Sequence, residues 1–213
     1  MQTALIATLG FEEKFCYRAI LRHGLKEGDR IILFTAELVE KVEKAYEWIK
    51  RLIQSSYGGA VKVELIQLDP LDPVRSIGSV LKVLDELDNF KIVVNLSGGM
   101  RAIVAYVLLA CIMRPKKEMK DEIEAEDLSG ITMLSSEMLK LIKSGVKEEW
   151  LDILKCIAEG ANDVKSIAEK LKKDESTIRR QISALEENGL VRIRKRKPLS
   201  LELSELAELF LQR

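Results

Sequence analysis

Short apolar runs alternate with longer helical patterns in the first half of the chain. Four runs have the apolar, β-branched content of strands: Ala4 to Thr8, Arg30 to Thr35, Val61 to Leu68 and Lys91 to Leu96. Four segments between and after them repeat apolar residues at helical spacing: Glu12 to His23, Glu37 to Tyr57, Val74 to Leu87 and Met100 to Met113. Asp72 followed by Pro73 predicts an N-cap and a first-turn proline for the third helix. This alternation predicts an α/β domain with a doubly wound parallel sheet.

The pattern changes after Pro115. A charged stretch, Lys116 to Asp127, is followed by Ser129-Gly130 and then by the apolar run Ile131 to Leu134, which predicts a hairpin that closes the sheet. The segment Ser136 to Lys143 predicts a connecting helix, and Ser144-Gly145 marks a break. We therefore expect an α/β domain over 1–134, a connection over 135–145 and a second domain over 146–213.

The second domain has the pattern of three helices followed by a hairpin. The expected helices are Lys147 to Glu159, Val164 to Leu171 and Ser176 to Asn188. Asn162 or Asp163 is expected to cap the second helix and Ser176 the third, while Gly189 ends the third in the left-handed conformation. The alternating runs Leu190 to Arg194 and Leu199 to Leu203 flank a basic turn, and a last helix begins at Ser204. This order predicts a winged helix-turn-helix.

One face of the third helix is apolar and the other polar. Ile178, Ile182 and Leu185 repeat at helical spacing and predict the packed face. The residues expected to contact DNA from this helix are Ser176, Thr177, Arg179, Arg180, Gln181 and Ser183. Arginine and glutamine make bidentate contacts with base edges in the major groove, and hydroxyls near a helix N-terminus suit a phosphate.

The predicted wing is strongly basic, although the whole chain has no net charge. Its expected DNA contacts are Arg192, Arg194, Lys195, Arg196 and Lys197. Between Val164 and Lys197 there are 11 Lys and Arg residues against 5 Asp and Glu, which favours contact with a phosphate backbone. A protein-docking or dimerisation module with a solvated basic hairpin is the alternative.

Two loops follow strands at the edge where open α/β sheets bind ligands. The first consists of Thr8, Leu9, Gly10 and Phe11. The second runs from Asn95 through Ser97, Gly98, Gly99 and Met100 to Arg101 and opens directly into a helix. Glycines allow close backbone approach and a helix N-terminus offers N–H groups to an anion, yet each loop alone also fits an ordinary turn. The GxGxxG and GxxxxGK[ST] motifs are absent, which argues against a dinucleotide cofactor and an NTPase, and we expect no cofactor.

The remaining composition narrows the class of protein. The chain of 213 residues is 47% hydrophobic and 32% charged, as in a folded protein. Cys16, Cys111 and Cys156 lie far apart in apolar patterns, so we expect neither disulfides nor a metal site. The longest apolar run, Ala102 to Met113, is too short for a bilayer and the N-terminus lacks a signal peptide, which predicts a cytoplasmic protein without membrane contact.

Two resemblances connect these motifs to known families. The segment SIAEKLKKDESTIRRQISALEENGLVRIRKRKP resembles the winged helix-turn-helix of archaeal and bacterial regulators, including the ArsR and MarR-like groups, and implies a dimer on a palindromic DNA site. The combination of TLGFEEKF and NLSGGMRA with that module resembles the CARF (CRISPR-associated Rossmann-fold) transcription regulators of archaeal CRISPR systems, over nearly the full chain.

The second resemblance implies a specific ligand site. In such regulators the CARF domains of a homodimer pair to form one pocket for a cyclic oligoadenylate, with cyclic tetra-adenylate as the expected ligand. The family motifs map onto Thr8 to Phe11 and Asn95 to Arg101, with glycine N–H groups on the phosphates, Asn95 and Ser97 as polar supports, and Arg101 as a cation. The resemblance implies a DNA-binding regulator of CRISPR-associated genes. A ring nuclease that cleaves the same ligand, or a protein-interaction scaffold, is the alternative.

Four further features have structural interpretations. His23 ends a helix before Gly24 and is expected to act as a C-terminal capping residue rather than a base. Asp69-Pro70 is expected to form a turn. Trp48 and Trp150 stand alone in amphipathic helices and are expected to be core or interface anchors.

Overall fold

The computed structural model describes residues 1–116, 118–196 and 199–211. The chain divides into two compact units, Met1–Leu139 and Lys140–Arg213. The division falls within helix α5 (Ser136–Ser144), in the segment predicted as the connection. Each unit is described by itself.

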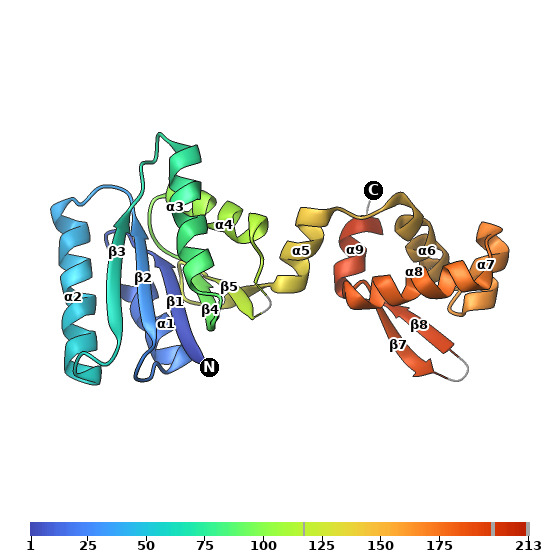
Figure 1. Ribbon diagram of the computed structural model, residues 1–213, viewed down its shortest axis with the longest axis horizontal. Helices are drawn as coiled ribbons and strands as arrows, with labels where there is room; N and C mark the ends of the chain where they lie inside the picture. The colour runs from blue at the N-terminus through green and yellow to red at the C-terminus, as the bar shows by residue number, and fades with distance from the viewer. Residues whose placement is uncertain (117, 197–198, 212–213) are drawn as a thin grey trace. The chain divides into compact units, whose positions relative to one another are not determined.

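The first unit contains a mixed sheet in the strand order β3-β2-β1-β4-β5-β6 (Figure 1). The strands are β1 (Gln2–Thr8), β2 (Arg30–Thr35), β3 (Lys62–Gln67), β4 (Phe90–Asn95), β5 (Met119–Glu124) and β6 (Ile131–Ser135). Neighbouring strands from β3 to β5 pair in parallel, and β6 returns antiparallel beside β5. The predicted doubly wound sheet and closing hairpin are therefore confirmed.

Helices cover both faces of this sheet because its inner strands are apolar on both sides. The helices are α1 (Lys14–His23), α2 (Glu40–Tyr57), α3 (Pro73–Glu86) and α4 (Arg101–Met113). Ile6, Ile32 and Val94 point into one core with residues of α3 and α4. Leu5 and Leu33, one position away, point into the other core with residues of α1 and α2. Strand order reverses between β1 and β4, which places the switch point at their carboxyl ends.

A side-chain cap explains where α3 begins, whereas two other helices begin later than predicted. Asp72 accepts a hydrogen bond from the Arg75 amide at 3.0 Å, with Pro73 in the first turn, as predicted for α3. The starts of α1 and α2 have no side-chain cap hydrogen bond, and both helices begin later than predicted. Residues 9–13 and 36–39 are therefore loops at the carboxyl edge of the sheet.

The second unit is a winged helix-turn-helix built as predicted. It contains α6 (Glu148–Ala158), α7 (Val164–Leu171), α8 (Glu175–Glu187), the hairpin of β7 (Val191–Arg196) and β8 (Leu199–Leu203), and α9 (Glu205–Leu211). Ile153, Ile167 and Ile178 are fully buried in its core. Asp163 caps α7 by accepting from the Ser166 amide at 3.0 Å, whereas the prediction that Ser176 caps α8 is wrong. The N-cap position of α8 is Asp174, because α8 already begins at Glu175.

None of the helices in the described part of the chain is both long and apolar enough to cross a membrane.

Candidate functional site

The two predicted loops touch each other at the switch point of the sheet. A Cβ on Gly10 would lie 2.9 Å from the Gly99 amide nitrogen, and one on Gly98 would lie 2.9 Å from the Thr8 carbonyl oxygen. Gly99 has a φ of 87°, a conformation that other residues rarely adopt. These glycines are therefore required for the contact between the loops, and a larger residue at Gly98 would displace the loop before it met any ligand.

Hydrogen bonds of Thr8 and Leu9 hold the first loop in place. The Thr8 hydroxyl donates to the Gly98 carbonyl at 2.6 Å, which ties the first loop to the second. The Leu9 amide donates to the Phe34 carbonyl at 2.8 Å and extends the pairing of β1 with β2. Both residues are buried, so their side chains support the loops, while exposed Phe11 offers a contact surface.

The second loop is fastened to β4 and β5 by its polar side chains. The Asn95 side chain is fully buried; its oxygen accepts from the Ser97 amide at 3.2 Å and its nitrogen donates to Glu122 Oε1 at 2.9 Å. Ser97 Oγ accepts from the Glu124 amide at 2.8 Å. Asn95 and Ser97 thus hold the loop itself in place, and their predicted role toward a ligand stays a prediction.

Sequence reasoning missed a cluster of charges beneath this loop. Glu122 and Glu124 project from one face of β5 and are almost completely buried. Arg22 Nη2 lies 2.7 Å from Glu122 Oε1, His23 Nε2 lies 2.9 Å from Glu122 Oε2, and Arg18 pairs with Glu124. Burial alone would raise the pKa of Glu122, but hydrogen bonds from His23, Arg22 and Asn95 outweigh it and lower the pKa to about 2.

The cluster changes the interpretation of His23. Gly24, rather than His23, occupies the C-cap position of α1, and the imidazole meets a buried carboxylate instead of the helix carbonyls. The signal for the cluster was present in the sequence. Glu122 and Glu124 stand two residues apart, so they share a face of the strand, and Arg18 and Arg22 stand four apart, so they share a face of α1.

The second loop opens into a helix whose N-terminus has no side-chain cap. Met100 occupies the N-cap position of α4 with extended backbone and forms no side-chain cap hydrogen bond. The first N–H groups of α4 therefore have no helical partner, and the helix dipole favours negative charge there. Arg101 is exposed in the first turn of α4.

Two cavities flank the contact between the loops. A cavity of about 490 Å³ is lined by residues of both loops together with Lys14 and Glu126. A second, of about 470 Å³, is lined by Gly10, Phe11, Gly99 and Met100 together with Glu37, Thr35 and apolar residues. The loops therefore present backbone, glycine and one exposed aromatic ring to open space, whereas Arg101 is in the lining of neither cavity.

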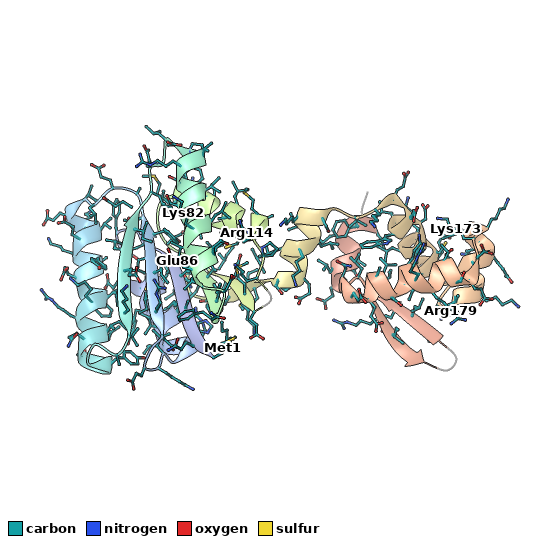
Figure 2. All side chains as sticks on the ribbon, viewed as in Figure 1. Met1, Lys82, Glu86, Arg114, Lys173 and Arg179 are labelled. Carbon is teal, nitrogen blue, oxygen red and sulfur yellow. The ribbon has the colours of Figure 1, made fainter. Side chains whose placement is uncertain are left out.

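In the second unit, α8 exposes most of the predicted DNA contacts. Ser176, Arg179, Arg180 and Ser183 are exposed and Thr177 is half-buried. Figure 2 shows the Arg179 side chain on the outer surface of α8, where its guanidinium lies 3.3 Å from Glu175 in an exposed pair.

Gln181 departs from the prediction. Its residue is 7% exposed, and its side-chain nitrogen donates to Glu149 on α6. The helical spacing explains this position, because Gln181 and Ile178 stand three residues apart and share the packed face of α8. The assignment of Gln181 as a base-reading residue is corrected to a role in packing α8 against α6.

The wing carries an internal ion pair. Arg194 contacts Glu202 on β8 with two nitrogens, at 2.5 and 2.7 Å, while Arg192 is exposed. Lys195 and Arg196 lie in β7, and Lys197 lies outside the described residues. The positive charge of Arg194, one of the predicted DNA contacts, is thus partly neutralised by Glu202 in the same hairpin.

Comparison with known proteins places this architecture in a family. Residues 3–135 match the model of the Csa3 CRISPR-associated Rossmann-like domain. The chain belongs to this Csa3 family. Residues 149–192 match the bacterial regulatory proteins of the arsR family, which are helix-turn-helix proteins. The chain thus joins a Csa3-type Rossmann-like domain to an arsR-type helix-turn-helix.

A solved structure shares the fold at low sequence identity. Enterococcus italicus Csm6 bound to cyclic hexa-2'-fluoro-hexa-dAMP superposes with a TM-score of 0.51 and 14% identity over 88% of this chain and 54% of that one. A type III CRISPR defence DNA nuclease activated by cyclic oligoadenylate gives a TM-score of 0.47 and 18% identity, over 88% of this chain and 30% of that one. This chain thus spans about half the length of the first and under a third of the second. No curated protein matches the sequence.

Proposed function

We propose that this protein is a homodimeric transcription regulator of CRISPR-associated genes that binds a cyclic oligoadenylate, with cyclic tetra-adenylate as the expected ligand. The observation that carries the proposal is the pair of touching glycine loops at the switch point of the sheet, beside the uncapped N-terminus of α4. Backbone N–H groups and a positive helix end suit the phosphates of such a ligand. The arsR-type module supplies the DNA-binding function.

The outer face of α4 supports the homodimer. This helix is apolar almost all round, and Leu109 and Met113 are 45% and 50% exposed. Arg101, Ala105 and Leu109 follow at intervals of four residues, so the exposed stripe begins at the end of the second loop. A second copy of the chain that covers this stripe would bring two copies of the loops together around one ligand.

Calorimetric titration with cyclic tetra-adenylate tests the ligand. We expect saturable binding of one ligand per two chains, and chromatography of the incubated mixture should return the ligand intact. Cleaved product would instead support a ring nuclease. The absence of binding by any cyclic oligoadenylate would contradict the proposed sensor.

The dimer is tested by light scattering on the Leu109→Glu variant. A charged side chain on the exposed stripe should give a monomer that remains folded, because Leu109 is not a core residue. Glu43→Gln on α2 is an exposed control that should stay dimeric. A dimeric Leu109→Glu variant would place the interface on another surface.

A further inference from the structure

The cavity beside the glycine loops is the middle section of a longer groove. The 470 Å³ cavity shares Gly10, Phe11 and Gly99 with the 490 Å³ cavity on one side. On the other side it shares Ala36 and Glu37 with a third cavity of about 510 Å³. The groove therefore follows the carboxyl edge of the sheet from β4 past β1 to β2 and β3, and it is larger than a phosphate requires.

Most residues that line the middle section are apolar. Leu9, Val39 and Val42 line it, and Phe11 and Met100 are 64% and 51% exposed beside it. The Lys41 ammonium lies 5.6 Å from the centre of the Phe11 ring, which holds the ring at the loop surface. An exposed aromatic ring at an apolar hollow next to an anion site suits a nucleobase, because bases stack on aromatic side chains while their phosphates stay in polar surroundings.

Glu37 is the charged group of this section. It lies two residues after the end of β2, is exposed, and lines both the apolar section and the third cavity. Its carboxylate makes no ion pair with any other described residue. An ionised carboxylate only accepts hydrogen bonds, so it selects a base that presents a donor.

We propose that the apolar section is a seat for adenine, in which the base stacks on Phe11 and its N6 amine donates to Glu37. This inference rests on the proposed function and adds the residue that sets base specificity. Hypoxanthine presents an oxygen in place of the N6 amine, and its acceptor would face the carboxylate. Glu37 should therefore discriminate adenine from hypoxanthine.

The test compares cyclic tetra-adenylate with cyclic tetra-inosylate by calorimetry. The wild-type protein should prefer the adenylate by about 10- to 100-fold, the range for a hydrogen bond to a charged group. Glu37→Gln should lose most of this preference, because an amide can accept from one base and donate to the other. The matched control Glu43→Gln, which removes the same charge from an exposed site on α2, should keep it.

Two more arms separate the possible failures. Phe11→Ala should weaken both ligands roughly 5- to 100-fold, and Phe11→Trp should restore binding, as expected for stacking. A Glu37→Gln variant with unchanged base preference overturns the assignment. The assignment also fails if Glu37→Gln keeps the preference for adenine over hypoxanthine but no longer distinguishes cyclic tetra-adenylate from its 2'-deoxy analogue. Glu37 would then contact the ribose and not the base. If wild-type protein binds no cyclic oligoadenylate, the proposed function fails and this inference falls with it.

Discussion

At the scale of single residues, the buried acids of β5 have opposite surroundings on the two faces of the sheet. Glu122 meets cations and an amide, which lower its pKa to about 2. Asp121, one residue earlier, is fully buried beside the Cys111 thiol of α4, and no hydrogen bond of good geometry reaches either of its oxygens from the described residues. Burial raises the pKa of Asp121 to about 7, against a smaller opposing effect of the Cys111 thiol.

This contrast predicts how stability depends on pH. Asp121 keeps its proton in the folded state while the unfolded chain releases it above about pH 4, so its contribution to folding stability falls as pH rises from about 4 to 7. In the wild-type protein this effect should lower the free energy of unfolding by about 2 kcal/mol between pH 5 and 7.5, and Asp121→Asn should abolish that decrease. Chemical denaturation at both pH values measures it.

The choice of pH range and a control variant separate the effect of Asp121 on stability from the effects of other acidic residues. Glu122 affects stability only between about pH 2 and 4.5, where stability rises with pH, so it lies outside the window. The exposed Glu43→Gln variant should keep the wild-type pH dependence. An unchanged decline in Asp121→Asn would show that another group causes it.

The recognition helix gives a second prediction at this scale. Replacing Arg179 or Arg180 by alanine should relax base preference by about 1–3 kcal/mol for each bidentate contact with guanine that is lost. The exposed ion pair between Arg179 and Glu175 should not prevent Arg179 from contacting DNA, since exposed ion pairs contribute little free energy. Random-site selection measures the preference. Two variants that select the same operator as strongly as the wild type would contradict the groove assignment.

At the scale of elements, the sequence predicts every helix and strand of both units, because apolar periodicity and glycine breaks are local signals. It places the starts of α1 and α2 two and three residues too early. The prediction that Gln181 contacts DNA is wrong. A single polar residue in a helical pattern does not by itself show whether it lies on the packed face or on the outer face. The Glu122 cluster joins α1 to β5, which lie about 100 residues apart, and only the fold brings them together.

The wing gives an element-scale prediction. Neutralising Arg194, Lys195 and Arg196 should weaken binding to all DNA sequences and reduce the dependence of affinity on salt, because fewer counterions are released. The Arg194–Glu202 pair predicts the opposite effect for a second variant. Glu202→Gln should release Arg194 from its ion pair and so strengthen binding to all DNA sequences. Titrations at several salt concentrations measure both effects. An unchanged salt dependence in the triple variant would remove the wing from the DNA interface.

At the scale of the whole molecule, a ligand can regulate DNA binding only if it binds the two DNA-binding states with different affinity. A series of hydrogen bonds and continuous chain leads from the second glycine loop to α5. The second glycine loop is hydrogen-bonded to β5, β5 pairs with β6, and β6 runs directly into α5. Leu139 and Leu141 of α5 belong to the cores of the first and second unit, respectively.

The last prediction separates sensing from DNA reading. Arg101 is exposed at the start of α4, so Arg101→Ala removes a charge from the proposed anion site without opening the core. We expect weaker binding of cyclic tetra-adenylate, by about 1 kcal/mol or more, with unchanged operator affinity in the ligand-free protein. Calorimetry and operator titration measure these affinities, circular dichroism reports the fold, and Arg51→Ala on α2 is the exposed control. A folded Arg101→Ala variant with wild-type ligand affinity would remove Arg101 from the site. Parallel losses of ligand and operator affinity would show instead that the residue stabilises the structure on which both sites depend.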